Sequence, residues 1–210
     1  MKRGEIYGLI GKNGSGKTTL FRILTGLIQK YSGIISVGES DAQQMKVSAV
    51  ICAPSLFLNM SAFENMKSQA TLQGVRDNGR ILQILKTVGL EDCKNKLAGS
   101  FSQGMMQRLK MGMALLDTPD ILILDEPVNG LDPDGIAQLR EQLHRLNQDD
   151  GVTILISSHI LSELAHVATC FGILHEGEIV REVFLEDILQ SGITLEQLYM
   201  QSTKGVKQPC

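Results

Sequence analysis

A glycine-rich segment near the start of the chain, Gly-Lys-Asn-Gly-Ser-Gly-Lys-Thr over residues 11–18, has the spacing of a phosphate-binding loop. Triphosphate oxygens need several donors that converge on a small volume. Backbone N–H groups supply them only where side chains do not block the approach, as at glycine. Residues 5–10 before the segment have the pattern of a short buried strand, and a run with helical spacing follows it. We therefore expect a strand, the loop, and a helix whose N-terminus attracts anions.

Each residue of this loop has a predicted role in holding a nucleotide. Lys17 provides a mobile cation for the β- and γ-phosphates, and the hydroxyl of Thr18 is placed to bind Mg²⁺. A glycine-rich turn that matches by chance is disfavoured, because a strand before and a helix after are the context that the motif requires. The predicted nucleotide-binding residues are Gly11, Lys12, Asn13, Gly14, Ser15, Gly16, Lys17, Thr18 and Thr19.

Two acids, Asp125 and Glu126, follow the continuous apolar run at residues 121–124. Continuous apolarity indicates a strand covered on both faces, and open α/β sheets bind ligands beyond the carboxyl ends of their strands. Asp125 is therefore predicted to hold Mg²⁺, directly or through water, and Glu126 to orient and deprotonate an attacking water. An isolated Asp-Glu pair is more often a helix cap or a solvated corner. The phosphate loop in the same chain favours the catalytic interpretation.

His159 lies just past another buried run, at residues 152–157, and is predicted to reach the same edge of the sheet as Asp125. A contact to the γ-phosphate is expected there, although a lone histidine is more often structural or solvated. His144, His166 and His175 have no such placement and are assigned no role.

The elements that position these groups alternate between strand-like and helix-like patterns, which predicts an α/β fold with a mostly parallel sheet. Residues of about 55–116 interrupt the alternation with helices only, and are predicted to form a helical subdomain inserted into a core of residues 1–54 and 117–210. The expected strands cover 5–10, 33–37, 47–53, 121–124 and 152–157, with a hairpin at 170–183. The expected helices cover 17–27, 102–116, 136–146 and 160–168, a helical pattern covers 61–97 with a stop at Gly89, and two short helices are expected in 185–200.

Composition sets the broad class. The chain has 210 residues, 43% of them hydrophobic, and a net charge of -3, which suits one domain and argues against a nucleic-acid partner bound through bulk charge. No apolar run reaches the ~18 residues of a membrane span. The four cysteines are scattered without a Cys-x-x-Cys pair, which favours reduced thiols in the cytoplasm over disulfides or a zinc site.

The segment Gly-Ser-Phe-Ser-Gln-Gly-Met-Met-Gln-Arg at residues 99–108 resembles the signature loop of ABC ATPases, in a variant with Ser-x-Gly-Met in place of Ser-Gly-Gly-Gln. The order of motifs, which ends with Gly-Leu-Asp at 130–132 and Ser-Ser-His at 157–159, is the order of that family and covers essentially the whole chain. The resemblance implies a P-loop NTPase core, Mg²⁺-dependent ATP hydrolysis, and a head-to-tail dimer with a second ATP-binding subunit, expected to be an identical copy.

In such a dimer, the resemblance implies that the signature residues of one copy meet the γ-phosphate held by Lys17 of the other. Asp132 is then expected to organise the dimer interface. Ser102 is also placed to cap the helix that it precedes, and both roles can hold. The implied signature residues are Ser102, Gln103, Gly104 and Met105.

The resemblance further implies that ATP closes the dimer and that closure is transmitted to a separate transmembrane permease. The chain is then expected on the cytoplasmic face of the cell membrane. The sequence Ser-x-Gly-Met-x-Gln-Arg-Leu and the stretch at residues 53–57 are similar to the ATPase subunits of bacterial bacteriocin, lantibiotic and bacitracin-type exporters. The transported substrate and the direction of transport stay open, because both reside in the partner. Soluble ABC proteins of ribosomes or chromosomes are disfavoured, because the chain has no heptads or second ATPase domain.

Two departures from the family pattern leave open an alternative, a nucleotide-binding regulatory or degenerate subunit with little turnover, although the intact Glu126 and His159 favour an active enzyme. Family members usually carry more residues before the phosphate loop, including an aromatic that stacks on adenine, so the chain is interpreted as truncated at its start, with Tyr7 a poor substitute. The position where the family has a Gln or Glu that touches Mg²⁺ is Cys52. A thiol is a poor ligand for this hard cation.

Overall fold

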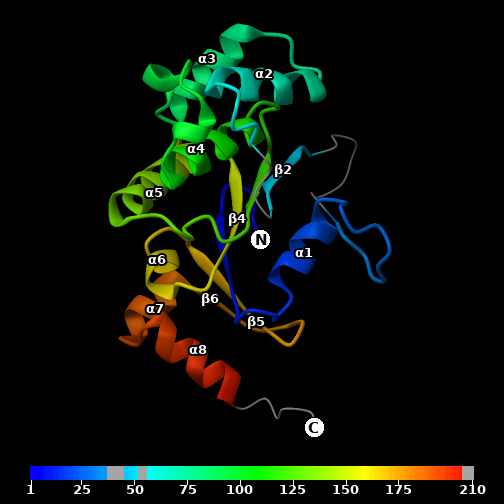
Figure 1. Ribbon diagram of the computed structural model, residues 1–210. Coiled ribbons are helices and arrows are strands. Elements are labelled where there is room, and N and C mark those ends of the chain that lie inside the picture. Colours follow the sequence, from blue (N-terminus) through cyan, green and yellow to red (C-terminus); the bar gives the residue numbers. More distant parts are fainter. Residues whose placement is uncertain (37–44, 52–55, 205–210) are drawn as a thin grey trace.

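The computed structural model describes residues 1–36, 45–51 and 56–204. A six-stranded sheet in the order β2-β3-β4-β1-β5-β6 forms its centre (Figure 1). Neighbouring strands of this sheet run parallel, except that β6 is antiparallel to β5. The predicted α/β fold with a mostly parallel sheet is confirmed. The strands are β1 (Ile6–Ile10), β2 (Val47–Val50), β3 (Ile121–Leu124), β4 (Thr153–Ser158), β5 (Cys170–His175) and β6 (Glu178–Phe184).

Helices cover both faces of the sheet. Phe21 of α1 packs with Leu9 and Leu155 on one face, while Leu139 and Leu143 of α5 belong to the larger hydrophobic cluster of the other. The helices are α1 (Lys17–Leu24), α2 (Ala62–Leu72), α3 (Asn78–Thr87), α4 (Gln103–Ala114), α5 (Pro133–Gln148), α6 (Leu161–Ala165), α7 (Leu185–Ser191) and α8 (Leu195–Lys204). Short 3₁₀ turns lie at Glu91–Cys93 and Ala98–Ser100.

Only helices lie in the described residues between β2 and β3, and α2, α3 and α4 group together at the top of Figure 1. Met66 and Leu109 of this group share one hydrophobic cluster with Ile154 and Ile156 of the sheet. The helices therefore pack on the sheet through a continuous core. The division into a core of residues 1–54 and 117–210 and an inserted subdomain of about 55–116 stays a prediction.

The register of the strands explains why distant motifs meet. Ile10 pairs with Ser158, and Leu124 pairs with Ile156, so the ends of β1, β3 and β4 lie at one edge of the sheet. Strand β4 lies between β1 and β3. The segments that follow these strands begin at residues 11, 125 and 159, and they therefore face one another across this edge.

Several predicted elements differ from those of the structure. Residues 33–36 of the expected strand at 33–37 form no strand, and residue 37 lies outside the described residues. Ile34 is 96% exposed, so this short apolar run has no sheet to cover it. The first helix ends at Leu24 rather than residue 27, because Gly26 takes a left-handed φ of 73°. The strand predicted at 47–53 ends at Val50, and residues 52–53 lie outside the described part.

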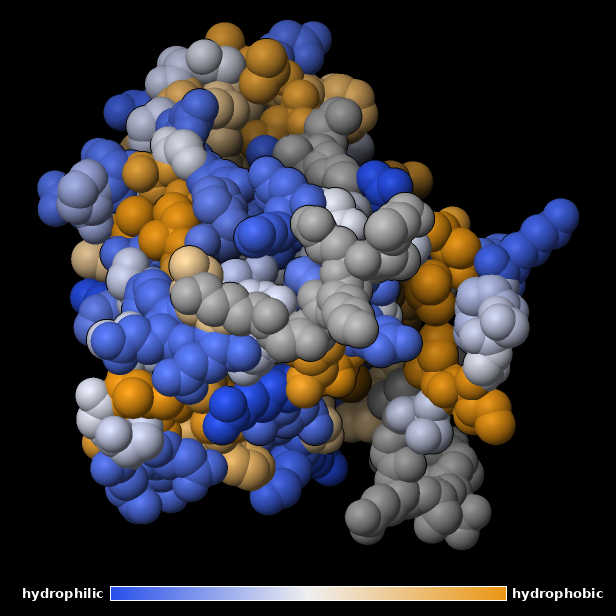
Figure 2. Space-filling view, turned by 90° about the horizontal axis from the view of Figure 1, so that it is seen from below, coloured by the Kyte–Doolittle hydropathy of each residue, from blue (hydrophilic) through white to orange (hydrophobic). Residues whose placement is uncertain are grey.

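Exposed apolar side chains occur at several places on the molecule, and one group of them lies beside α1. Figure 2 shows hydrophobic residues gathered at its right-hand side, where Figure 1 places α1 and the segment after it. Leu27 and Ile34 of that segment are 68% and 96% exposed. None of the helices in the described residues combines the length and apolar character that a membrane crossing needs.

Candidate functional site

The turn at residues 11–16 joins β1 to α1 in a conformation that glycine makes possible. Gly14 and Gly16 have φ values of 84° and 108°, where side chains other than hydrogen are strained. A Cβ at Gly11 would lie 2.7 Å from the Leu174 carbonyl oxygen. Gly16 is also the N-cap of α1 and makes no side-chain capping bond. The first N–H groups of the helix therefore have no side-chain cap and are suited to an anion.

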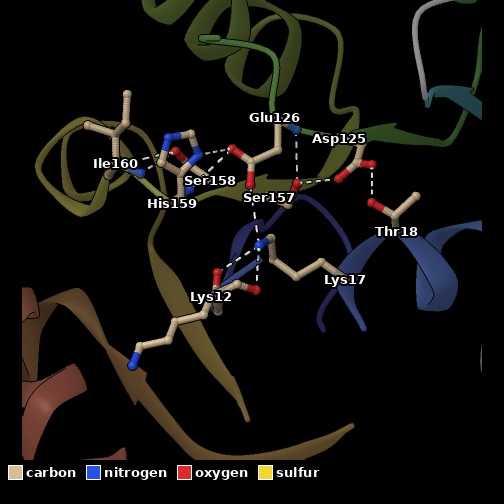
Figure 3. Close-up of polar contacts among 10 residues, drawn as sticks. Lys12, Lys17, Thr18, Asp125, Glu126, Ser157, Ser158, His159 and Ile160 are labelled. Carbon is tan, nitrogen blue, oxygen red and sulfur yellow. Dashed lines mark hydrogen bonds and ion pairs between the residues drawn. The ribbon is translucent and has the colours of Figure 1, made fainter. Parts of the chain in front are cut away.

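Lys17 is held over this turn and points at Glu126. Its Nζ donates to the carbonyl oxygens of Gly11, at 2.6 Å, and of Lys12, at 3.3 Å. The same Nζ lies 3.3 Å from Oε1 of Glu126, and the lysine side chain is only 6% exposed (Figure 3). The ammonium group thus lies between the phosphate loop and the predicted base. This is the position expected for a lysine that binds the phosphates of a nucleotide.

Thr18 and Asp125 lie together, although 107 residues separate them in the sequence. Thr18 Oγ1 donates a hydrogen bond of 2.6 Å to Oδ2 of Asp125. A hydroxyl beside a carboxylate suits Mg²⁺, which binds through one or two protein carboxylates and completes its shell with water and phosphate oxygens. Within the described residues no three His, Cys, Asp or Glu side chains form a metal cluster. This donor set fits a nucleotide-bound magnesium ion better than a protein-enclosed metal.

Glu126 adopts a backbone conformation that its side chain disfavours, with a φ of 52°. One carboxylate oxygen, Oε2, accepts from the backbone N–H of His159 at 3.2 Å and lies 2.7 Å from Nδ1 of the same histidine. The other, Oε1, forms the ion pair with Lys17 but accepts no hydrogen bond in the described structure. That oxygen can accept a proton from a water molecule, which is the chemistry expected of a general base.

His159 meets Glu126 at the end of β4, as Figure 3 shows, and its side chain is 47% exposed. The structure therefore brings together the two residues predicted to be catalytic. A contact between His159 and a γ-phosphate stays a prediction. His144 contacts the His166 carbonyl oxygen, and His175 lies 4.0 Å from Glu176, so neither belongs to this cluster.

The predicted signature residues begin α4, which lies apart from α1 in Figure 1. Ser102 is its N-cap and accepts from the Met105 N–H at 3.3 Å, as the sequence predicted. Ser102 and Gln103 are exposed. Asp132 is also exposed and caps α5 by accepting from the Gly135 N–H at 2.9 Å. Both caps are accessible to a second molecule, and their action in a dimer stays a prediction.

Ser157 is a residue of the cluster whose role the sequence analysis missed. Its hydroxyl donates to Oδ1 of Asp125 at 2.7 Å and accepts from the Glu126 N–H at 2.9 Å. The available signal was a polar residue at the end of an otherwise apolar strand. Cys52, the predicted departure from the family, lies outside the described residues.

Tyr7 is buried in β1 and donates to Oε1 of Glu182 at 2.5 Å. Burial and this hydrogen bond raise the pKa of Tyr7 far above its usual value. The ring is therefore not available to stack on a nucleotide base, which agrees with its predicted unsuitability.

Sequence comparisons place the chain among known proteins. The sequence profile described as ABC transporter matches residues 1–129. The lantibiotic transport ATP-binding protein SrtF of Streptococcus pyogenes is 44% identical over 200 residues, which are 94% of this chain and 85% of that protein. The bacitracin transport ATP-binding protein BcrA of Bacillus licheniformis is 43% identical over 189 residues, 87% of this chain. The match covers 62% of that relative's length, so the chain spans less than two thirds of it.

Solved structures agree with these relatives. An ATP-binding subunit of an ABC transporter superposes with a TM-score of 0.79 at 30% identity, over 96% of this chain and 89% of the other. A dimeric ATP-binding cassette in a post-hydrolysis state, bound to ADP and Pi, superposes with a TM-score of 0.73 at 26% identity. That match covers 88% of this chain and 87% of the cassette.

Proposed function

This chain belongs to the ABC transporter family as an ATP-binding member, and from that premise we propose that it hydrolyses ATP with Mg²⁺ to power a separate membrane permease. The observation that carries the proposal is the convergence of Lys17, Thr18, Asp125 and Glu126 at one edge of the sheet. These residues come from two segments of the sequence, and each has the chemistry that one part of the reaction requires.

Lys17 and the backbone of the loop bind the β- and γ-phosphates, and the uncapped start of α1 adds a positive electrostatic potential. Thr18 and Asp125 would hold Mg²⁺, which supplies positive charge to offset that of the phosphates. Other functional residues proposed from the loop are Gly11, Lys12, Asn13, Gly14, Ser15, Gly16 and Thr19.

Glu126 orients the attacking water and accepts its proton at Oε1, the oxygen that accepts no hydrogen bond from the described protein. His159 contacts the other oxygen of the same carboxylate, and its side chain is partly exposed to solvent. Its position supports a second role, in which the imidazole contacts the γ-phosphate and links it to Glu126.

A second copy is proposed to complete each site. The exposed Ser102 cap, followed by Gln103, Gly104 and Met105, offers a helix start to the γ-phosphate bound by the partner. Asp132 lies at the neighbouring start of α5 and is proposed to organise the contact. The dimeric cassette among the similar structures supports this arrangement.

The permease partner and its cargo are proposed from the relatives. SrtF and BcrA are named as transport proteins for a lantibiotic and for bacitracin, so export of a peptide antibiotic is the cargo that we propose. The chain would then act at the cytoplasmic face of the membrane, bound to the permease.

The test is ATP hydrolysis by the purified chain with Mg²⁺, with EDTA, and after Glu126→Gln. We expect turnover that needs Mg²⁺ and falls about 10²–10⁴-fold in Glu126→Gln, because a positioned base contributes a factor of that size. ATP binding should persist in the variant. The matched control is Glu141→Gln, which alters an exposed i,i+4 pair with Arg145 on α5 and should leave turnover unchanged.

Equal turnover in wild type and Glu126→Gln would remove Glu126 from the role of base. Tight ATP binding without hydrolysis, even with the permease present, would instead select the alternative of a regulatory or degenerate nucleotide-binding subunit.

A further inference from the structure

Ser157 is a fully buried serine between the two acids of the site, with 0% of its surface exposed. It lies near the end of β4, where Ile156 pairs with Leu124 of the neighbouring strand. The next residue on each strand is therefore Ser157 on β4 and Asp125 after β3. Hydroxyl groups buried in an apolar strand are costly unless they form hydrogen bonds, so the partners of Ser157 define what it does.

Its hydroxyl makes two hydrogen bonds whose directions are determined by chemistry. The backbone N–H of Glu126 can only donate, so Ser157 Oγ accepts that bond, at 2.9 Å. The single hydroxyl proton is then free for the carboxylate of Asp125, at 2.7 Å from Oδ1. Figure 3 shows this chain of bonds from Glu126 through Ser157 to Asp125 and on to Thr18.

The bond to Oδ1 orients the carboxylate of Asp125. Because Oδ1 is bound by Ser157, the other oxygen, Oδ2, is directed at Thr18 Oγ1, 2.6 Å away. The carboxylate is thus held with one oxygen toward β4 and the other toward the hydroxyl that we assign to magnesium. Hydrogen bonds to metal-binding carboxylates orient them and tune their affinity.

The bond from Glu126 N–H stabilises an unfavourable backbone conformation. Residues other than glycine at a φ near the 52° of Glu126 are strained and persist where surrounding contacts hold them. That conformation directs the side chain toward Lys17 and His159. One hydroxyl therefore orients the carboxylate of Asp125 and also holds the backbone conformation from which the side chain of Glu126 extends.

We propose that Ser157 is a positioning residue that couples the magnesium ligand Asp125 to the base Glu126. The inference rests on the proposed ATPase function and adds a residue to it. Ser157 is not proposed to touch ATP or Mg²⁺. Its removal should therefore reduce the gain in ATP affinity that Mg²⁺ provides. Binding of ATP without the metal, through Lys17 and the phosphate loop, should be unchanged.

The experiment measures ATP affinity of wild type and Ser157→Ala with Mg²⁺ and with EDTA, together with turnover at saturating Mg²⁺. In Ser157→Ala we expect the gain in affinity from Mg²⁺ and the turnover each to fall about tenfold or more, as is typical for partners of metal ligands. Affinity in EDTA should match that of wild type. A structural defect alone would lower affinity in both conditions.

The matched control is Thr153→Val at the opposite end of β4. Thr153 is 2% exposed, and its hydroxyl also accepts from a backbone N–H, that of Gly4 at 3.0 Å. This variant loses a buried hydroxyl from the same strand, at the end away from the site. Mg²⁺ should raise its ATP affinity as much as it does that of wild type. If Mg²⁺ raised the affinity of Ser157→Ala as much, the positioning role would be overturned.

A second variant covers the case in which Ser157→Ala does not fold. The thiol of Ser157→Cys is a weaker donor and acceptor, so its magnesium effect should be reduced. An undiminished effect in a folded Ser157→Cys protein would contradict the inference. Wild-type protein that binds ATP equally with and without Mg²⁺ would overturn the proposed metal site itself, which distinguishes that failure from failure of the Ser157 role.

Discussion

At the residue scale, the site is organised around Lys17 and Glu126, two charged side chains with little exposure to solvent. Lys17 is 6% exposed and Glu126 is 18% exposed, and they lie 3.3 Å apart. Charges in such surroundings interact more strongly than they would in water, and each depends on the other for compensation. A change at either residue should therefore affect the whole site, whereas changes at exposed ion pairs should have little effect.

Replacement of Lys17 by methionine should weaken ATP binding about 10–100-fold, because hydrogen bonds to charged groups contribute about 1.5–3 kcal/mol. Nucleotide affinity by fluorescence titration measures the effect. The matched control is Lys46→Met, which removes a lysine paired with Asp117 at the surface. An unchanged ATP affinity in Lys17→Met would exclude the proposed phosphate contact.

At the element scale, helix N-termini recur at the positions that we propose to be functional. The loop before α1 leaves its helix start without a side-chain cap, whereas Ser102, Asp132 and Ser61 cap α4, α5 and α2. The cap of α2 is a complete capping box, in which Ser61 and Glu64 satisfy each other's backbone N–H groups. Asn65, fully buried, bonds both the N–H and the carbonyl of Phe57 and holds the preceding turn against the helix.

The capping box predicts a pH-dependent contribution to stability. Hydrogen bonds from the backbone and the side chain of Ser61 lower the pKa of Glu64 below 4.5. A carboxyl whose pKa is lower in the folded state stabilises the fold above its unfolded pKa, and this contribution is lost as the pH falls through the folded pKa. Ser61→Ala should lower the free energy of unfolding by about 1 kcal/mol near neutral pH.

Urea denaturation at neutral pH and at a pH well below 4.5 tests this prediction. The difference in stability between wild type and Ser61→Ala should shrink at the acidic pH, because protonation of Glu64 weakens its bond with the Ser61 hydroxyl, whereas its bond with the backbone N–H of residue 61 exists in both proteins. Ser100→Ala, which removes an exposed hydroxyl bonded to the Leu97 carbonyl, serves as the control and should show little change. A difference that stays constant with pH would contradict the role of Glu64.

At the scale of the whole molecule, the accessible starts of α4 and α5 lie beside each other. The first turn of α4 approaches that of α5, since a Cβ on Gly104 would lie 4.0 Å from Gly135. A Cβ at Gly104 meets only ordinary van der Waals contacts, and the neighbouring Ser102 and Gln103 are exposed, so we expect the folded subunit to accept an aspartate there. The proposed dimer would not, because that turn would face the γ-phosphate of the partner's nucleotide.

Gly104→Asp should therefore fold normally and fail to dimerise. We expect Glu126→Gln with ATP and Mg²⁺ to elute as a dimer in size-exclusion chromatography with light scattering, and Glu126→Gln/Gly104→Asp to elute as a monomer. The control is Glu126→Gln/Asn78→Asp, in which the second change adds the same charge to the first turn of α3. This double variant should keep the dimer. Dimers of equal stability in both double variants would argue against the proposed role of the signature turn.

Local chemistry was largely readable from the sequence. The strand at residues 121–124 was predicted with its observed bounds, and the Ser102 cap and the strand–loop–helix around Lys17 were also correct. These features depend on neighbouring residues, since hydrophobic periodicity, glycine spacing and capping are set within a few positions of the chain. The strand expected at 33–37 is absent from the described residues 33–36. A strand needs a neighbouring strand to pair with, and a local sequence pattern does not show whether one is present.

Only the tertiary structure decided which residues meet. That β4 lies between β1 and β3 depends on pairings between distant segments, and this order brings Ser157 between Asp125 and Glu126. The sequence by itself determined the set of groups that we propose to bind phosphate, ligate magnesium and activate water. The register of the sheet determined their distances, because strand pairing fixes which residues stand opposite one another, whereas spacing along the chain constrains only their order.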